Sequence, residues 1–384
     1  MRTLGPTPPM IDPRLIKLSL EALAGKADRV VGYFYAVLFT ADPSLRDLFP
    51  AAMDLQRDRL FQALLQIGQD IENPVALTAY LQQLGRDHRK YGVRDEHYPA
   101  VGAALLAALS SYAGDLWTAE LAESWTEAYE FAAKTMIEAA QALATTEPPY
   151  WSGQVVRHQR YGSDIAVLTI LPDQPLPYRS GQYLSVETSR WPRVWRTYSI
   201  ANAPRSDHTL ELHVRAVPAG WVSSALVHHT RPGDLLRLGP ALGSMVLDPA
   251  STRPLVLIGG GTGIAPIKAL VQQLARTPYA RTTRVFFGVR KIEDLYDLSP
   301  LTRLSLAQPW LTIAPVVSDE PTYPGLCGPV VQTADELTAW RGHEVYLCGP
   351  PPMVRNGLAV LEKAGVPSHD VHFDPFPAAS PEWP

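Results

Sequence analysis

The stretch Arg196-Thr197-Tyr198-Ser199-Ile200 carries a basic residue, an aromatic residue and a hydroxyl at the spacing of a β-strand. Alternation places Arg196, Tyr198 and Ile200 on one face of that strand and Thr197 and Ser199 on the other. A flat redox cofactor with a phosphate tail needs an aromatic ring to pack on, a guanidinium for the phosphate and a small donor near its reactive nitrogen. The pentapeptide supplies all three. The same pattern is also common in ordinary edge strands, so the surrounding sequence has to decide between the two interpretations.

The residues around this stretch predict a small antiparallel β-barrel. Turn signals such as Ser180-Gly181 separate short β-branched runs, and one short helix, at 222–229, interrupts them. The runs lie at 152–159, 164–171, 182–187, 195–202, 209–216 and 234–239. The segment Glu147-Pro148-Pro149-Tyr150 precedes them as a linker.

The two flanking regions have different patterns. From Pro254 onward, predicted strands at 254–259, 285–289, 311–318 and 344–348 alternate with helices, which indicates a doubly wound parallel sheet. Before the linker, apolar stripes of period 3.6 predict helices at 13–24, 27–40, 43–49, 55–70, 74–90, 98–112 and 117–145, with breaks at Asp42-Pro43, Asn73-Pro74 and Gly92. We therefore predict three domains, all-α at 1–147, antiparallel β-barrel at 150–250 and α/β at 253–384.

Composition narrows the class of protein. The 384 residues are 46% apolar and 19% charged, which is typical of a globular chain, and no apolar run approaches the ~18 residues of a membrane helix. Two cysteines, Cys327 and Cys348, cannot form a disulfide framework. Residues 1–148 hold 13 Lys+Arg against 19 Asp+Glu, which argues against a nucleic-acid partner. We expect a cytoplasmic monomer with no stable membrane insertion and no covalently attached haem.

The α/β region carries a nucleotide-binding signal. The predicted strand ending in Val256-Leu257-Ile258 leads directly into Gly259-Gly260-Gly261-Thr262-Gly263-Ile264-Ala265-Pro266 and then into a helical stripe. Glycines let backbone amides approach a pyrophosphate at a helix N-terminus, and proline suits the first helical turn. The last predicted strand ends at Cys348-Gly349-Pro350-Pro351-Pro352-Met353, and strand carboxyl ends line the cofactor crevice of such a sheet.

In these three motifs and in their order, the barrel and α/β regions resemble the ferredoxin-NADP reductase-like family. The resemblance implies that FAD contacts Gln182, Tyr183, Arg196, Thr197, Tyr198, Ser199, Gly220, Val222, Ser223 and Ser224. It also implies that NAD(P) contacts Gly261, Thr262, Gly263, Pro266, Cys348, Gly349 and Pro350, and that Phe376 stacks on the flavin. Plain core packing is the alternative for Phe376.

The helical region contains two histidines, of which His88 continues the apolar stripe Leu77, Leu81, Leu84. A histidine in that place is commonly a satisfied core residue. With Phe34-Tyr35, Leu48-Phe49-Pro50 and the segment from Gln56 to Phe61, however, the region resembles a globin, and the chain from about residue 12 to Phe376 resembles a flavohaemoglobin. That resemblance makes His88 the proximal iron ligand. It makes Tyr35 and Gln56 the distal polar residues, Leu60 the distal gate, Phe49 the residue that wedges the haem and Tyr98 the support of His88.

Two positions depart from the family pattern. A glutamate commonly follows a tryptophan of the last globin helix by fifteen residues and pairs with the proximal histidine, but counting from Trp125 reaches Ala140. Glu138 lies nearby on a different helix face, and Asp87 stands where lysine often precedes the histidine. Both differences resemble a divergent flavohaemoglobin subgroup with other redox roles.

The resemblance implies a nitric oxide dioxygenase with haem b and FAD, in which NAD(P)H reduces the flavin, the flavin reduces the haem, and nitric oxide and O2 become nitrate. The alternatives are another redox role, such as D-lactate oxidation through the flavin, or a gas-binding or sensing protein. Arg290 and Lys291 favour a 2′-phosphate, whereas Glu293 and Asp294 oppose it, and we expect NADH.

Overall fold

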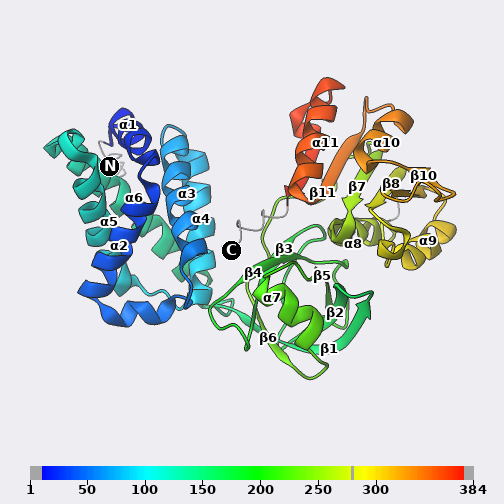
Figure 1. The fold of residues 1–384 in the computed structure, drawn as a ribbon, viewed down its shortest axis with the longest axis horizontal. Coiled ribbons are helices and arrows are strands. Elements are labelled where there is room, and N and C mark those ends of the chain that lie inside the picture. Colours follow the sequence, from blue (N-terminus) through cyan, green and yellow to red (C-terminus); the bar gives the residue numbers. More distant parts are fainter. Residues whose placement is uncertain (1–10, 278–280, 376–384) are drawn as a thin grey trace, which may run out of the picture. The chain divides into compact units, whose positions relative to one another are not determined.

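The computed structural model describes residues 11–277 and 281–375 and divides the chain into two compact units, Met1–Tyr150 and Trp151–Pro384. The first unit is helical (Figure 1). Its α-helices are α1 (Pro13–Ala24), α2 (Ala27–Ala41), α3 (Asp54–Asp70), α4 (Pro74–His88), α5 (Tyr98–Ala113) and α6 (Ala119–Ala144). Short 3-10 turns lie between them, the longest at Pro43–Leu48.

Local sequence sets the helix starts. The Asp12 carboxylate accepts a hydrogen bond from the backbone N–H of Arg14, and the Asn73 side chain does the same for Ala76 at the start of α4. Proline follows both caps, where its missing N–H has no cost. Thr118 caps α6 in the same way. The helix starts at 13 and 74 thus follow from cap and proline chemistry.

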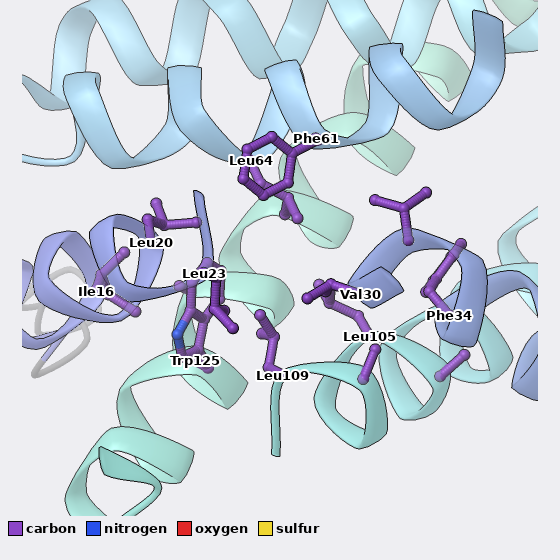
Figure 2. Packing of buried hydrophobic residues seen from close by; sticks show 14 of the residues in the cluster. Ile16, Leu20, Leu23, Val30, Phe34, Phe61, Leu64, Leu105, Leu109 and Trp125 are labelled. Atoms are coloured by element: carbon purple, nitrogen blue, oxygen red, sulfur yellow. The ribbon is translucent and has the colours of Figure 1, made fainter. Parts of the chain in front are cut away.

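The helices enclose a core around Trp125, which is 2% exposed. In Figure 2 the side chains of α1, α2, α3, α5 and α6 converge on this core. The indole Nε1 of Trp125 donates to the Ser19 hydroxyl at 3.0 Å, and that hydroxyl donates to the Ile16 carbonyl at 2.8 Å. A second, smaller cluster of Leu77, Leu81, Ala132 and Met136 joins α4 to α6. This second cluster positions the end of α4.

The second unit begins with an antiparallel sheet of order β4-β3-β6-β1-β2-β5. Its strands are β1 (Trp151–Tyr161), β2 (Ile165–Pro172), β3 (Tyr183–Thr188), β4 (Arg196–Ser199), β5 (Leu210–Arg215) and β6 (Leu235–Leu238). An isolated antiparallel bridge between Ile200 and Leu212 links the end of β4 to β5, so the two edge strands of the sheet meet. The helix expected at 222–229 is divided into α7 (Trp221–Ser224) and a π-helical turn (Ala225–His229).

The rest of the second unit contains a parallel sheet of order β10-β9-β8-β7-β11-β12. Its strands are β7 (Leu255–Gly260), β8 (Thr283–Val289), β9 (Leu311–Val317), β10 (Leu326–Cys327), β11 (Glu344–Gly349) and β12 (Val371–Pro375). Helices α8 (Ile264–Leu274) and α9 (Leu298–Ala307) pack in one core cluster, and α10 (Val330–Leu337) and α11 (Pro351–Lys363) in another, so helices cover both faces (Figure 1). This is the predicted doubly wound sheet. Within the residues described, no helix has the length and apolar character needed to cross a membrane.

Candidate functional site: a histidine pocket and a flavin-nucleotide site

His88 is the last residue of α4, and its ring is oriented by its own helix. Its Nδ1 lies 2.7 Å from the Leu84 carbonyl one turn earlier, which requires the proton on Nδ1 and leaves the Nε2 lone pair available. Burial lowers the pKa of His88, against the smaller effect of the hydrogen bond to Leu84, so the ring is neutral. A neutral imidazole with an available Nε2 is the form that binds iron, so His88 fits an axial ligand of haem.

His97, the other histidine of the helical region, makes a hydrogen bond within its own turn. Its Nδ1 accepts a hydrogen bond from the backbone N–H of Arg94 at 3.1 Å, inside the short turn Asp95–His97. Its neighbour Tyr98 packs beside the cluster of Leu77, Leu81, Ala132 and Met136, and burial raises the pKa of Tyr98 to about 12. The Tyr98 carbonyl accepts the hydroxyl of Tyr129 at 2.5 Å. Tyr98 therefore lies against α4 and α6.

Helices α4 and α6 touch at Gly85. A Cβ on Gly85 would lie 2.2 Å from the Met136 carbonyl oxygen, so only glycine fits this crossing. Arg89, just after α4, donates to the carbonyl of Glu147, which lies just beyond α6. Because both residues follow the crossing in sequence, α4 and α6 run in the same direction there. Three residues after Gly85 comes His88, and four after Met136 comes Ala140, which is partly buried. Glu138 is exposed, with its carboxylate 4.0 Å from the Lys134 amine.

The distal candidates meet in an aromatic cluster. The ring of Tyr35 stacks on Phe39 at 5.6 Å and meets Phe49 edge-on at 5.5 Å. Its hydroxyl donates to the backbone carbonyl of Gln56 at 3.3 Å. This hydrogen bond therefore joins Tyr35 to the main chain of Gln56 and not to its side chain. Burial raises the pKa of Tyr35 well above its usual value. Leu60, one turn further along α3, packs partly buried against the same core.

The flavin candidates lie along β4 and the elements beside it. Tyr198 is paired with Leu184 of β3 and Ser199 with Tyr183, and burial raises the pKa of Tyr198 well above its usual value. Thr197 is exposed, and a guanidinium nitrogen of Arg196 donates to the Trp195 carbonyl at 3.0 Å.

Two of the predicted polar flavin contacts also make local hydrogen bonds. The Gln182 amide accepts from the backbone of Arg179 and donates to the Gly243 carbonyl. The Ser223 hydroxyl donates to the Gly220 carbonyl at 3.0 Å. Val222 is buried and Ser224 is partly buried. Gln182 and Ser223 thus hold the turns on either side of the flavin candidates.

The glycine-rich loop packs directly on the end of β11. A Cβ on Gly263 would lie 2.3 Å from the Cys348 carbonyl oxygen, and Gly261 has φ +55° in the left-handed region. Pro266 is buried in the first turn of α8, Thr262 and Gly349 lie beside the contact, and Pro350 is exposed. The two predicted nucleotide motifs therefore meet at the N-terminus of α8, and backbone N–H groups at a helix N-terminus are suited to bind a pyrophosphate.

One functional candidate was missed. Asp374 is paired with Cys348 across β12 and β11, and the Ser199 hydroxyl near Cys348 lowers the pKa of its thiol. Burial raises the pKa of Asp374 to about 6, and burial and the Asp374 charge together raise the pKa of Cys348. The position of Asp374 at the end of a strand, two residues before Phe376, was the available signal. Phe376 itself lies outside the described residues.

Three family models match the chain: Globin over residues 32–136, Oxidoreductase FAD-binding domain over 152–246 and Oxidoreductase NAD-binding domain over 257–357. The chain is 27% identical to a flavohemoprotein of Rhodopirellula baltica over 393 residues, covering 94% of this chain and 96% of that protein. It is 34% identical to the xylene/toluene monooxygenase electron transfer component of Pseudomonas putida over 242 residues, or 62% of this chain and 67% of that protein.

A solved structure has the same fold. The flavohemoglobin of Malassezia yamatoensis with bound FAD and heme matches with a TM-score of 0.80 and 20% identity, covering 96% of this chain and 100% of that one. At this identity the match shows the fold alone. The fold, the three family models and the flavohemoprotein relative agree on one domain combination, a globin domain followed by FAD-binding and NAD-binding domains.

Proposed function

Since the chain belongs to the flavohaemoglobin family, we propose that it is an NAD(P)H-dependent nitric oxide dioxygenase that converts nitric oxide and O2 to nitrate. The globin domain implies haem, and the two oxidoreductase domains imply FAD and NAD(P)H. When bound, these groups supply hydride acceptance, single-electron transfer and oxygen binding. The domain limits that go with this proposal are 1–147, 150–250 and 253–384.

The observation that carries the proposal is that one chain holds both a neutral histidine with an available Nε2 and a joined flavin-nucleotide site. A binding or sensing protein needs the first feature. Sustained turnover would need both, because electrons from the nucleotide would have to be supplied for each nitric oxide oxidised.

In this proposal, different residues bind the cofactors and donate hydrogen bonds. His88 would hold the haem from the α4 side. Tyr35 carries one hydroxyl proton, which it donates here to the Gln56 carbonyl and would have to turn toward a bound ligand. Since its pKa is raised by burial, Tyr35 remains a donor at neutral pH. A hydrogen bond from a buried phenol stabilises negative charge on a small ligand because little water competes with it. Ser199, beside Cys348, offers a small hydroxyl where the flavin and nucleotide motifs meet.

Nitric oxide consumption by the purified holoprotein tests the proposal. With NADH and O2 in excess, we expect many nitric oxide molecules removed per chain, nitrate as product and NADH oxidised in step. Consumption that stops at one nitric oxide per haem would contradict it and favour a gas-binding or sensing protein. NADPH in a parallel assay tests the expected preference for NADH.

A second redox role is favoured by one observation, the small side chain of Ala140 one turn beyond the Gly85–Met136 crossing. No carboxylate therefore stands at that place to support the Nδ1–H of His88, which the Leu84 carbonyl accepts instead. Reduction of the flavin by D-lactate without nucleotide would favour that role over nitric oxide dioxygenation.

A further inference from the structure

A buried group of charges joins the antiparallel sheet to the parallel-sheet region of the second unit. Lys268 of α8 is 7% exposed and Asp297, before α9, is 3% exposed. The Lys268 amine lies 3.1 Å from the Asp297 carboxylate and 3.4 Å from that of Glu211, which belongs to β5. A lysine this deeply buried is uncommon unless paired, and here two carboxylates pair it.

Glu211 is itself held by several groups. It forms an ion pair with Arg205, and its Oε1 lies 3.9 Å from Nε2 of His213, whose Nδ1 meets the Tyr296 hydroxyl at 2.8 Å. Burial alone raises the pKa of Glu211, but the neighbouring His213 ring and the charges of Lys268 and Arg205 hold it well below its usual range. Glu211 is therefore ionised, and Lys268 is its link to α8.

Lys268 is the first member of a row along one side of α8, which we call the α8 latch (Lys268, Gln272 and Arg276). One turn after Lys268, the Gln272 side chain accepts the backbone N–H of Ala203 at 3.1 Å. Just past the helix end, Arg276 donates to the Pro204 carbonyl. Residues at i and i+4 lie on the same side of a helix, and Arg276 follows just past the helix end, so the three contacts form one docking edge.

The partners of the α8 latch follow directly from the flavin strand. Ala203 and Pro204 come four and five residues after Ser199, and the backbone N–H of Ala201 donates to the Glu211 carbonyl at 2.8 Å. On its own side, α8 begins where the glycine-rich loop packs against Cys348. The latch thus connects the helix that carries the nucleotide loop to the chain that carries the flavin serine.

Stability alone does not explain this choice of residues. A buried ion pair commonly contributes no more than a well-packed apolar pair of the same volume, because desolvation offsets the attraction. Hydrogen-bonded charges are directional, whereas apolar contacts are not, because they fix which atoms meet and at what distance. Transfer between two bound rings depends on such placement, and a shift of about 1 Å lowers a rate by as much as about a hundredfold.

We propose that the α8 latch fixes the register between the nucleotide loop and the flavin strand, and that Lys268 is a positioning residue for hydride transfer. In that transfer a hydride leaves the reduced nicotinamide, the nucleotide departs oxidised, and two electrons and a proton reach the flavin. The inference rests on the reductase part of the proposed function and is independent of nitric oxide chemistry.

Stopped-flow reduction of the flavin by NADH in the full-length holoprotein tests it. The variants are Lys268→Met and the double variant Lys268→Met/Asp297→Asn, which removes the carboxylate that the first leaves unpaired. Lys363→Met, at an exposed lysine of α11, is the matched control. We expect the limiting rate to fall about tenfold or more in both test variants, with the NADH dissociation constant changed less than about threefold.

Deuterated NADH separates positioning from a general loss of structure. We expect a larger isotope effect on the limiting rate in the Lys268 variants, because a misplaced nicotinamide makes hydride transfer slower relative to the other steps. Unchanged rates and isotope effects in both variants would overturn the proposal. If either variant fails to retain FAD, Gln272→Leu decides instead, with an expected fall of about threefold and rejection if its rate equals wild type. A wild-type flavin that NADH does not reduce would overturn the reductase function itself.

Discussion

Asp374 makes the second unit sensitive to pH in a direction that can be worked out. Its carboxyl lies beside Cys348, and burial raises its pKa from 3.8 to about 6. Below pH 3.8 the group is protonated in both the folded and the unfolded chain, so it has no effect on stability there. As pH rises, the unfolded chain loses the proton first, and the folded state becomes progressively less stable until about pH 6. Above that pH the cost is constant.

The pKa shift sets the size of the effect. A rise from 3.8 to about 6 corresponds to roughly 3 kcal/mol of destabilisation at pH 8. Asparagine has nearly the same shape and no charge, so Asp374→Asn should remove most of this cost. We expect the variant to be more stable than wild type by about 2–3 kcal/mol at pH 8 and equal to it near pH 3.8 or below.

Urea unfolding at a series of pH values measures this difference. The release of flavin fluorescence reports the second unit separately from the haem band, which is necessary because a chain of several domains does not unfold in one step. Asp319→Asn, at an exposed carboxylate of the same unit, is the control and should show no such pH dependence. A stability gain for Asp374→Asn that is the same at pH 4.5 and pH 8 would refute the reasoning.

Three further predictions concern the cofactors. His88→Ala should abolish the haem absorption band and leave flavin reduction by NADH intact, and full haem occupancy in the variant would contradict the assignment of His88. Ser199→Ala should slow flavin reduction about tenfold in stopped-flow traces, whereas Tyr35→Phe should leave that step unchanged, and equal slowing by both would reject the separation of roles. Ala140→Glu should raise the iron–histidine stretching frequency in resonance Raman, and an unchanged frequency with the carboxylate ordered beside His88 would count against that idea.

The sequence predicted the fold class because its signals are local. Caps at Asp12 and Asn73, each followed by proline, identify the first residue of α1 and of α4. The short strand Leu326–Cys327 and the edge strand Val371–Pro375 were missed, since two residues carry no periodicity and the second follows α11 without a β-branched run. Helix ends were also imprecise: α4 ends at His88, not at residue 90, because the chain tightens into a 3-10 turn there.

The candidate site could be predicted only where a sequence motif lies at the end of a predicted strand. The glycine-rich loop and the Cys348 motif could be paired from the rule that strand ends meet at one edge of a sheet. Asp374 lies at the same edge but its strand was not predicted, and Lys268 could not be found that way. Lys268 meets carboxylates 57 residues before it and 29 residues after it, and no local pattern distinguishes such a lysine from an exposed one. Contacts of that separation are properties of the folded chain.

Burial raises the pKa of both Tyr35 and Asp374, but the consequence at neutral pH differs between the two groups. Tyr35 and Asp374 are both raised in pKa, but the phenol starts far above neutral pH and the carboxyl starts below it. Between pH 5 and 8 the Tyr35 hydroxyl therefore keeps its proton, while Asp374 passes from mostly neutral to mostly charged. We therefore expect the rate of flavin reduction to change across this interval with the charge of Asp374, whereas the protonation of Tyr35 stays constant. Replacing Asp374 with asparagine should for that reason flatten the pH profile of flavin reduction, whereas Tyr35→Phe should leave its shape unaltered.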